Sequence, residues 1–300
     1  MTQLSRTRTA VYLAFLVLMW GINWPLSKFA LGYAPPLLFA GLRIFIGGLL
    51  LLPFAITRYK KLNLKQTWPI YLISSALNIV LFYYLQTIGL NEMPAGQFST
   101  IVFLQPVLLG IGSWLWLKES MFMGKWVGLL LGFIGVALVC YNGGTGSASV
   151  TGIVLGLGSA VCYAAGTIYM KRTAAHVDAV WLITLQTFIG GLALLIMGTS
   201  FESWGEIVWN TPFLVSLAVI ALFVTALGWL AYFSLVGSGE ASKVGAYTFL
   251  IPLTATLTSV IFLGETVKPE FAAGFVLVIT SIVLVNRKPM SRNVERSEAA

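Results

Sequence analysis

The chain has 300 residues, of which 58% are apolar and only 9% are charged. Soluble domains carry about 25% charged residues, so this composition excludes a water-soluble globular protein. The net charge of +8 does not indicate binding to nucleic acid, because the basic residues are scattered over short loops and do not gather on one face.

Apolar segments recur from one end of the chain to the other, each about 20 residues long, the length that crosses a hydrocarbon core of about 30 Å. The first follows a basic start (Arg6, Arg8) and resembles a signal peptide, but Lys28 interrupts it and it has a partner later in the chain. The sequence therefore predicts an all-α integral membrane protein. Its ten transmembrane helices are expected at 10–31, 36–56, 68–86, 94–116, 125–141, 151–171, 178–198, 212–235, 241–263 and 270–286.

Lysine and arginine lie mostly on one side of this topology. Fifteen of the eighteen fall on the side that holds both chain ends, two (Lys28, Lys268) fall on the other side, and Arg43 lies within a span. The positive-inside rule then places both termini in the cytoplasm and requires an even number of spans. The fifteen are Arg6, Arg8, Arg58, Lys60, Lys61, Lys65, Lys118, Lys125, Lys171, Arg172, Lys243, Arg287, Lys288, Arg292 and Arg296.

Charged residues within spans are expensive and indicate a function or a structural role. Arg43 lies about seven residues into the second span, where two roles are open: attracting a substrate carboxylate, or hydrogen bonding to helix-end carbonyls. Lys28 lies near the outer end of the first span, where its side chain can reach the headgroups, so we interpret it as an anchor.

Aromatic, amide and hydroxyl side chains recur at helical spacing on several spans. A cavity built from them would suit neutral amino acids and aromatic cations. The alternative is that the aromatic residues are interfacial anchors and that the hydroxyls bond within their own helices. The candidate substrate-binding residues are Trp20, Asn23, Trp24, Tyr83, Gln97, Thr100, Gln105, Tyr163, Trp229, Tyr247 and Thr248.

Two prolines, Pro106 and Pro252, stand in the middle of the fourth and ninth spans. Each removes a backbone donor and tends to kink its helix. The two prolines are interpreted either as a pair of hinges for alternating access or as static kinks that shape the cavity.

None of the ten Asp and Glu residues lies in the middle of a predicted span, so the sequence does not support proton coupling through a membrane carboxylate. The two cysteines, Cys140 and Cys162, lie far from any Cys or His cluster, and neither a metal nor a cofactor is expected. Asp178 is the only Asp, and a membrane serine would lack a base partner, so the protein is not expected to be an enzyme.

The second half of the chain repeats the first, at an offset of 143 residues and then of 146. The paired positions are Trp20 with Tyr163, Lys28 with Lys171, Arg43 with Gln186, Gly47 with Gly190, Gly48 with Gly191, Ala95 with Ala241, Leu104 with Leu250, Pro106 with Pro252, Leu117 with Leu263, Glu119 with Glu265 and Gly128 with Gly274. Each repeat holds five spans, an odd number, so the halves have opposite orientations. We predict a first repeat at 1–147, a second, inverted repeat at 148–287 and a cytoplasmic tail at 288–300.

From Trp20 to about Val285 the chain resembles the drug/metabolite transporter superfamily, in its ten-helix EamA-type branch. The resemblance rests on a set of short motifs in order: Trp20-Gly21 with Lys28, Arg43, Leu117-Lys118-Glu119 with Gly128, Gly132 and Gly135, and the echo Leu263-Gly264-Glu265 with Gly274. Within that branch the chain is most similar to the YddG-type exporters of aromatic amino acids and of some cationic toxic compounds.

This resemblance implies a multi-pass protein of a bacterial inner membrane that exports a small molecule by alternating access. Because the family commonly has Arg at this position whatever its substrate, the structural role of Arg43 is favoured. The expected partners are a small-molecule substrate and the lipid bilayer, with no nucleic acid, and a monomer is favoured over a dimer. The alternatives are transport of a phosphorylated or nucleotide sugar and a non-transporting scaffold or receptor.

Overall fold

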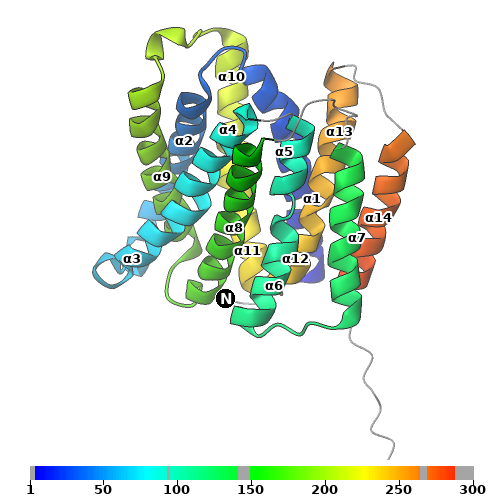
Figure 1. The fold of residues 1–300 in the computed structure, drawn as a ribbon. Coiled ribbons are helices and arrows are strands. Elements are labelled where there is room, and N and C mark those ends of the chain that lie inside the picture. Colours follow the sequence, from blue (N-terminus) through cyan, green and yellow to red (C-terminus); the bar gives the residue numbers. More distant parts are fainter. Residues whose placement is uncertain (1–3, 93–94, 141–148, 264–268, 288–300) are drawn as a thin grey trace, which may run out of the picture.

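The computed structural model describes residues 4–92, 95–140, 149–263 and 269–287, and these residues form helices joined by short loops, with no strand (Figure 1). Their longer helices are α1 (Arg6–Ala30), α2 (Pro36–Ile56), α3 (Leu64–Ser75), α4 (Phe82–Asn91), α5 (Ala95–Val102), α6 (Gln105–Leu117), α7 (Met123–Cys140), α8 (Val150–Thr173), α9 (Ala179–Phe201), α10 (Thr211–Val219), α11 (Gly228–Ser238), α12 (Ala241–Thr248), α13 (Leu250–Leu263) and α14 (Pro269–Asn286).

Ten crossings result from the described helices, because four crossings are each built from two of them: α3 with α4, α5 with α6, α10 with α11, and α12 with α13. Eight stretches are long and apolar enough to span a membrane, whereas α7 is shorter and the ninth crossing is interrupted. The predicted all-α membrane fold is confirmed. The predicted tail lies outside the described residues.

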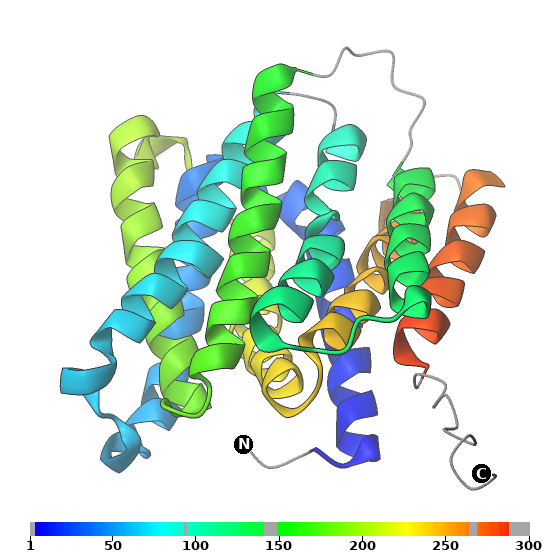
Figure 2. The same ribbon diagram turned by 60° about the horizontal axis from the view of Figure 1, so that its bottom comes forward.

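The two halves contact each other through equivalent pairs of helices (Figures 1 and 2). The helix α2 packs along α9, and α7 packs along α14. The contact of α1 with α13 is equivalent, through the repeat, to the contact of α8 with α6. The α2–α9 pair is close because of glycine: a Cβ on Gly48 would lie 2.6 Å from the Phe188 nitrogen, and one on Gly191 would lie 2.4 Å from the Phe45 nitrogen. These two glycines are the repeat mates found in the sequence.

The start of α2 is capped from the other half of the chain. This helix begins with Pro36 and has no side-chain cap of its own. The Glu202 carboxylate, which follows α9, accepts hydrogen bonds from the backbone nitrogens of Leu37 at 2.9 Å and Leu38 at 2.7 Å. A carboxylate at a helix N-terminus satisfies free N–H groups and interacts favourably with the helix dipole. Glu202 therefore stabilises the α2–α9 pair at one end.

The fourth and ninth crossings are broken near their middle. The break between α5 and α6 falls at Phe103 and Leu104, and the break between α12 and α13 falls at Phe249. Pro106 and Pro252 lie in the first turn of the helix after each break, where the missing donor costs little. Where the sequence predicted kinks, the structure has breaks at equivalent depths of the two repeats.

The third and eighth crossings share a further irregularity, which the sequence did not predict. Each contains a π-helical segment, Ala76–Leu81 between α3 and α4 and Ile220–Leu227 between α10 and α11. Wide turns of this kind leave backbone carbonyls without their usual partners and occur often at functional sites. In the second segment, the Val224 carbonyl accepts a hydrogen bond from Trp20 Nε1 at 3.2 Å.

Candidate functional site

A cavity of about 400 Å³ lies between the two halves of the chain. Side chains of both repeats line it: α1, α2 and α4 contribute from the first repeat, and α8 and α11 from the second. It extends to Leu31 and Pro36, next to the loop that joins α1 to α2. The lining consists of Trp20, Asn23, Trp24, Pro25, Ser27, Lys28, Leu31, Pro36, Phe39, Ala40, Arg43, Phe82, Tyr83, Gln86, Thr87, Phe98, Val102, Phe103, Gln105, Tyr163, Val224, Trp229 and Ile251.

Most of the residues selected from the sequence meet at this cavity. Those in its lining are Trp20, Asn23, Trp24, Lys28, Arg43, Tyr83, Gln105, Tyr163 and Trp229. Outside the lining are Thr100, Tyr247, Thr248, Pro106 and Pro252. The Thr248 hydroxyl donates instead to the Gly245 carbonyl of its own helix, at 2.7 Å. The Gln97 side chain lies outside the described part of the chain.

Several lining residues were not predicted from the sequence, because their side chains are apolar. Phe39, Phe82 and Phe98 face the cavity, yet nothing in their type separates them from core residues. A signal existed for Phe39 alone, since it lies four residues before Arg43 and so on the same face of α2.

Arg43 is held in place by neutral partners. Its Nη1 donates to Asn23 Oδ1 at 3.1 Å and to Ser27 Oγ at 3.2 Å, two residues one turn apart on α1. The guanidinium carbon lies 5.3 Å from the centre of the Phe39 ring and 5.1 Å from that of Tyr83, both cation–π distances. The residue is 9% exposed. Within the described residues, its hydrogen bonds thus go to side chains of α1 and not to helix-end carbonyls.

An aromatic cluster forms another wall of the cavity. The ring of Trp229 lies 5.7 Å from Trp20 and 6.3 Å from Tyr163, measured between ring centres. Tyr232, which is fully buried, contacts the same two rings at 5.3 and 5.7 Å. Trp20 and Tyr163 are repeat mates, so the two halves bring equivalent aromatic residues to one place. Aromatic faces at such distances provide a surface on which a flat apolar group can stack.

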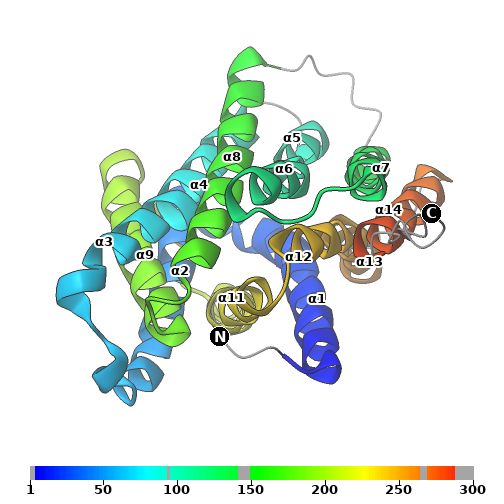
Figure 3. The same ribbon diagram turned by 90° about the horizontal axis from the view of Figure 1, so that it is seen from below.

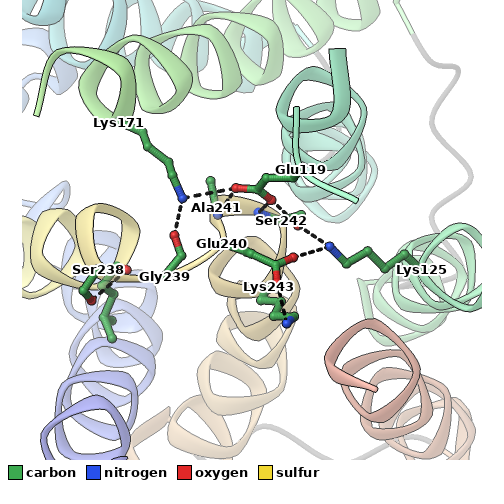
Figure 4. A network of polar contacts seen from close by, with 10 residues as sticks. Glu119, Lys125, Lys171, Ser238, Gly239, Glu240, Ala241, Ser242 and Lys243 are labelled. Atoms are coloured by element: carbon green, nitrogen blue, oxygen red, sulfur yellow. Dashed lines mark hydrogen bonds and ion pairs between the residues drawn. The ribbon is translucent and has the colours of Figure 1, made fainter. Parts of the chain in front are cut away.

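The opposite end of the bundle is closed by a polar network around Glu119 (Figure 4). Lys118 takes a left-handed conformation, with φ 55°, which ends α6 and directs the next residue toward α12. The Glu119 carboxylate accepts from the backbone nitrogens of Ala241 at 2.6 Å and Ser242 at 3.1 Å, and pairs with Lys171 Nζ at 3.2 Å. Lys171 also donates to the Gly239 carbonyl. The network thus fastens α6, α8 and α12 together.

A second ion pair extends this network to α7. Lys125, whose side chain is 1% exposed, pairs with Glu240, and Glu240 also pairs with Lys243 at 2.6 Å. Burial alone would raise the pKa of Glu240, but hydrogen bonds and charge attraction from the two lysines outweigh burial and lower it. The carboxylate is therefore ionised at neutral pH.

The cavity thus reaches one end of the bundle, and the Glu119 network lies at the other end, the end from which Figure 3 shows the helices. Fixed donors and aromatic faces around an apolar space are the features of a small-molecule binding site. Across the described ranges, no three His, Cys, Asp or Glu side chains gather as a metal site would require.

Comparison with known proteins gives a consistent result. The model of the EamA-like transporter family matches residues 7–141 and again residues 150–287. The "Uncharacterized transporter YvbV" of Bacillus subtilis is 60% identical over 288 residues, which cover 96% of this chain and 94% of the relative. A "Probable amino-acid metabolite efflux pump" of Salmonella typhimurium is 27% identical, over 91% of this chain and 93% of the relative.

Two further comparisons are more distant. An "S-adenosylmethionine/S-adenosylhomocysteine transporter" of Chlamydia trachomatis is 24% identical, over 90% of this chain and 87% of its own. A crystal structure of a protein that is 18% identical superposes with a TM-score of 0.82, over 94% of this chain and 97% of the other. At that identity the superposition shows the fold alone.

Proposed function

The chain belongs to the EamA-like transporter family, and from this premise we propose that it exports aromatic and other neutral amino acids from a bacterial cytoplasm by alternating access. The single observation that carries the proposal is the composition of the cavity. A guanidinium with neutral partners and an aromatic wall line one space of about 400 Å³, large enough for an amino acid.

Two comparisons support the choice of amino acids. The Salmonella relative carries the name of an amino-acid metabolite efflux pump. The motifs of the sequence also resemble the YddG-type exporters of aromatic amino acids, a resemblance that extends the proposal to aromatic cationic toxic compounds. We place the protein in the inner membrane with both termini cytoplasmic, because of the lysine and arginine bias.

The proposed working unit is one chain, with repeats 1–147 and 148–287 as its moving halves. A single copy supplies the whole lining of the cavity. A phosphorylated or nucleotide sugar fits less well, because a ligand with several negative charges needs several buried cations, and Arg43 is the only buried one among the described residues of the lining. A scaffold or receptor without transport does not account for a lined cavity between inverted repeats.

Efflux from intact cells tests this proposal. Cells that express the protein are loaded with a phenylalanine dipeptide, which cytosolic peptidases hydrolyse, and the phenylalanine released into the medium is measured over time. We expect faster release than from cells with an empty vector, at equal internal phenylalanine. Equal release by both strains, with the protein shown to be in the membrane, would contradict the proposed export.

A further inference from the structure

We infer that the cavity recognises both charges of a zwitterion: Arg43 binds the carboxylate and Gln105 accepts a hydrogen bond from the ammonium group. The inference rests on the proposed function and names the ligand chemistry of the same cavity. It ranks zwitterionic amino acids above amines that lack a carboxylate, including the aromatic cations expected from the sequence.

The positive charge of Arg43 has no described carboxylate to balance it. Its two hydrogen bonds to described residues go to neutral oxygens, of Asn23 and Ser27, and both come from the same nitrogen, Nη1. Its buried Nε has no hydrogen-bond partner. The rings of Phe39 and Tyr83 fix the plane of the group. A guanidinium that is held in this way keeps donors for a carboxylate, which it binds best through two parallel hydrogen bonds.

In the second repeat, the position equivalent to Arg43 carries no cation. The mate of Arg43 is Gln186, which occupies the equivalent place on α9 in the same helix pair. Gln186 is fully buried, accepts a hydrogen bond of 2.5 Å from Ser74 Oγ and does not line the cavity. One position of the repeated fold thus carries a neutral amide where it faces protein, and a cation where it faces the cavity. Because a charge within the membrane is costly, the cation points to a ligand of opposite sign.

An acceptor for an ammonium group stands in the same lining. Gln105 begins α6 directly after the break in the fourth crossing and is 6% exposed. Its Oε1 is buried and has no hydrogen-bond partner. Since no described residue of the lining carries a carboxylate, neutral oxygens must meet the ligand's positive group there. An amine without a carboxylate would gain this acceptor but would lie near Arg43, which carries the same charge.

The test compares three ligands that share a phenylethyl skeleton and differ in their charged groups. Binding of L-phenylalanine, 2-phenylethylamine and 3-phenylpropionate to the purified protein is measured by isothermal titration calorimetry. The second ligand lacks the carboxylate and the third lacks the ammonium group. We expect phenylalanine to bind about tenfold to a hundredfold more tightly than phenylethylamine, as loss of a charge-assisted hydrogen bond implies. Phenylpropionate should fall between the two.

Variants assign the two charges to residues. Arg43→Gln should remove the difference between phenylalanine and phenylethylamine, and Gln105→Leu the difference between phenylalanine and phenylpropionate. Arg172→Gln is the matched control, because it removes an exposed arginine that does not line the cavity and should leave the order of the three ligands unchanged. If Arg43→Gln does not fold, the order of the ligands on the wild-type protein still decides.

Equal binding of phenylalanine and phenylethylamine to the wild-type protein would overturn the inference, and amino-acid efflux from cells would still stand. The expected order of ligands without efflux would keep the inference and reject the proposed export. Binding of none of the three would overturn the inference as well. If the Arg43→Gln variant binds the three ligands in the same order of affinity as the wild type, Arg43 does not bind the carboxylate.

Discussion

Neighbouring tryptophans of α1 are tied to the cavity wall in different ways. Trp20 donates its indole N–H to the Val224 carbonyl and contacts the rings of Trp229 and Tyr232. Trp24, one turn later, contacts Phe103 at 6.2 Å between ring centres, and no described residue accepts a hydrogen bond from its indole. The first tryptophan therefore stabilises the fold as well as lining the cavity.

Replacing these two residues by phenylalanine should separate the roles. Trp20→Phe leaves the Val224 carbonyl of the π-helical segment without its partner, and an unsatisfied buried group costs about 1–3 kcal/mol. Trp24→Phe removes ring area alone and serves as the matched control. Thermal unfolding in detergent should show a larger fall in Tm for Trp20→Phe. Equal falls would mean that the indole hydrogen bond contributes nothing.

Acid should weaken the Glu240 ion pairs. A carboxylate whose pKa is lower in the folded protein contributes stability above its unfolded pKa, near the usual 4.5, and this contribution disappears as the pH falls through the folded pKa. The Tm difference between wild type and Glu240→Gln should stay constant from about pH 7 to about pH 5 and narrow below pH 4.5. A difference that narrows already between those two pH values would contradict a lowered pKa.

A single site residue could be predicted from the sequence where its charge or its place in an apolar segment made it stand out. Arg43 was identified from the sequence because a charge in an apolar segment is conspicuous. Its hydrogen bonds go to the side chains of Asn23 and Ser27 and not to helix-end carbonyls, because the fold brings α1 within its reach. The structural role that was favoured for it stays a prediction. Phe82 and Phe98 could not be predicted, because an apolar side chain looks the same whether it faces a cavity or the core.

Among the elements, the two broken crossings place a flexible point beside the cavity. In α6 and α13, Pro106 and Pro252 follow the breaks and cannot donate to the carbonyls four residues earlier, those of Val102 and Thr248. Alanine at either position would supply that donor and favour a continuous helix.

The breaks follow from proline chemistry and could be located from the sequence, whereas the π-helical segments of the third and eighth crossings have no such marker.

Pro106→Ala and Pro252→Ala should slow transport more than they weaken binding. A continuous helix resists the bending that the exchange of conformations needs, while the ligand-contacting side chains stay in place. Phenylalanine flux in proteoliposomes and phenylalanine affinity in detergent measure the two effects. Pro53→Ala, in the exposed last turns of α2, is the control and should change neither. Equal losses of flux and affinity would reject the hinges.

The Glu119 network should protect the start of α12. Its carboxylate accepts from the Ala241 and Ser242 amides, so Glu119→Gln removes a charged cap and the ion pair with Lys171. Hydrogen–deuterium exchange at the Ala241 and Ser242 amides, read from a peptide that begins several residues before them, should become about tenfold faster, the change expected for about 1.4 kcal/mol. Glu206→Gln, on an exposed loop, is the control. Unchanged protection in Glu119→Gln would show that the carboxylate does not hold this end closed.

For the whole molecule, the repeat explains both the architecture and the cavity. The offsets of 143 and 146 residues identify which helices are equivalent, and the structure packs α2 with α9 and α7 with α14 across the two halves. Ten crossings and two inverted repeats could therefore be predicted from the sequence. The closed end could not, because Glu119 and its partner Ser242 lie far apart in the chain and meet only in the folded protein.

The path of the substrate involves both ends of the bundle. The cavity reaches Leu31 and Pro36 at one end, and the Glu119 network closes the other. Under the proposed alternating access, the closed end opens while the other end closes, as the two inverted halves exchange conformations. No described carboxylate lines the cavity, so transport is expected to run without a proton gradient.

The most direct test of transport through this cavity is phenylalanine counterflow into proteoliposomes that contain the purified protein. Wild type is compared with Ala40→Trp, which fills the cavity from a lining position, and with Leu49→Trp, on an exposed face of the same helix. We predict uptake by wild type and Leu49→Trp, independent of a pH gradient, and none by Ala40→Trp. Equal uptake by all three proteins would show that phenylalanine does not pass through the cavity, and no uptake by correctly folded wild type would reject phenylalanine as a substrate.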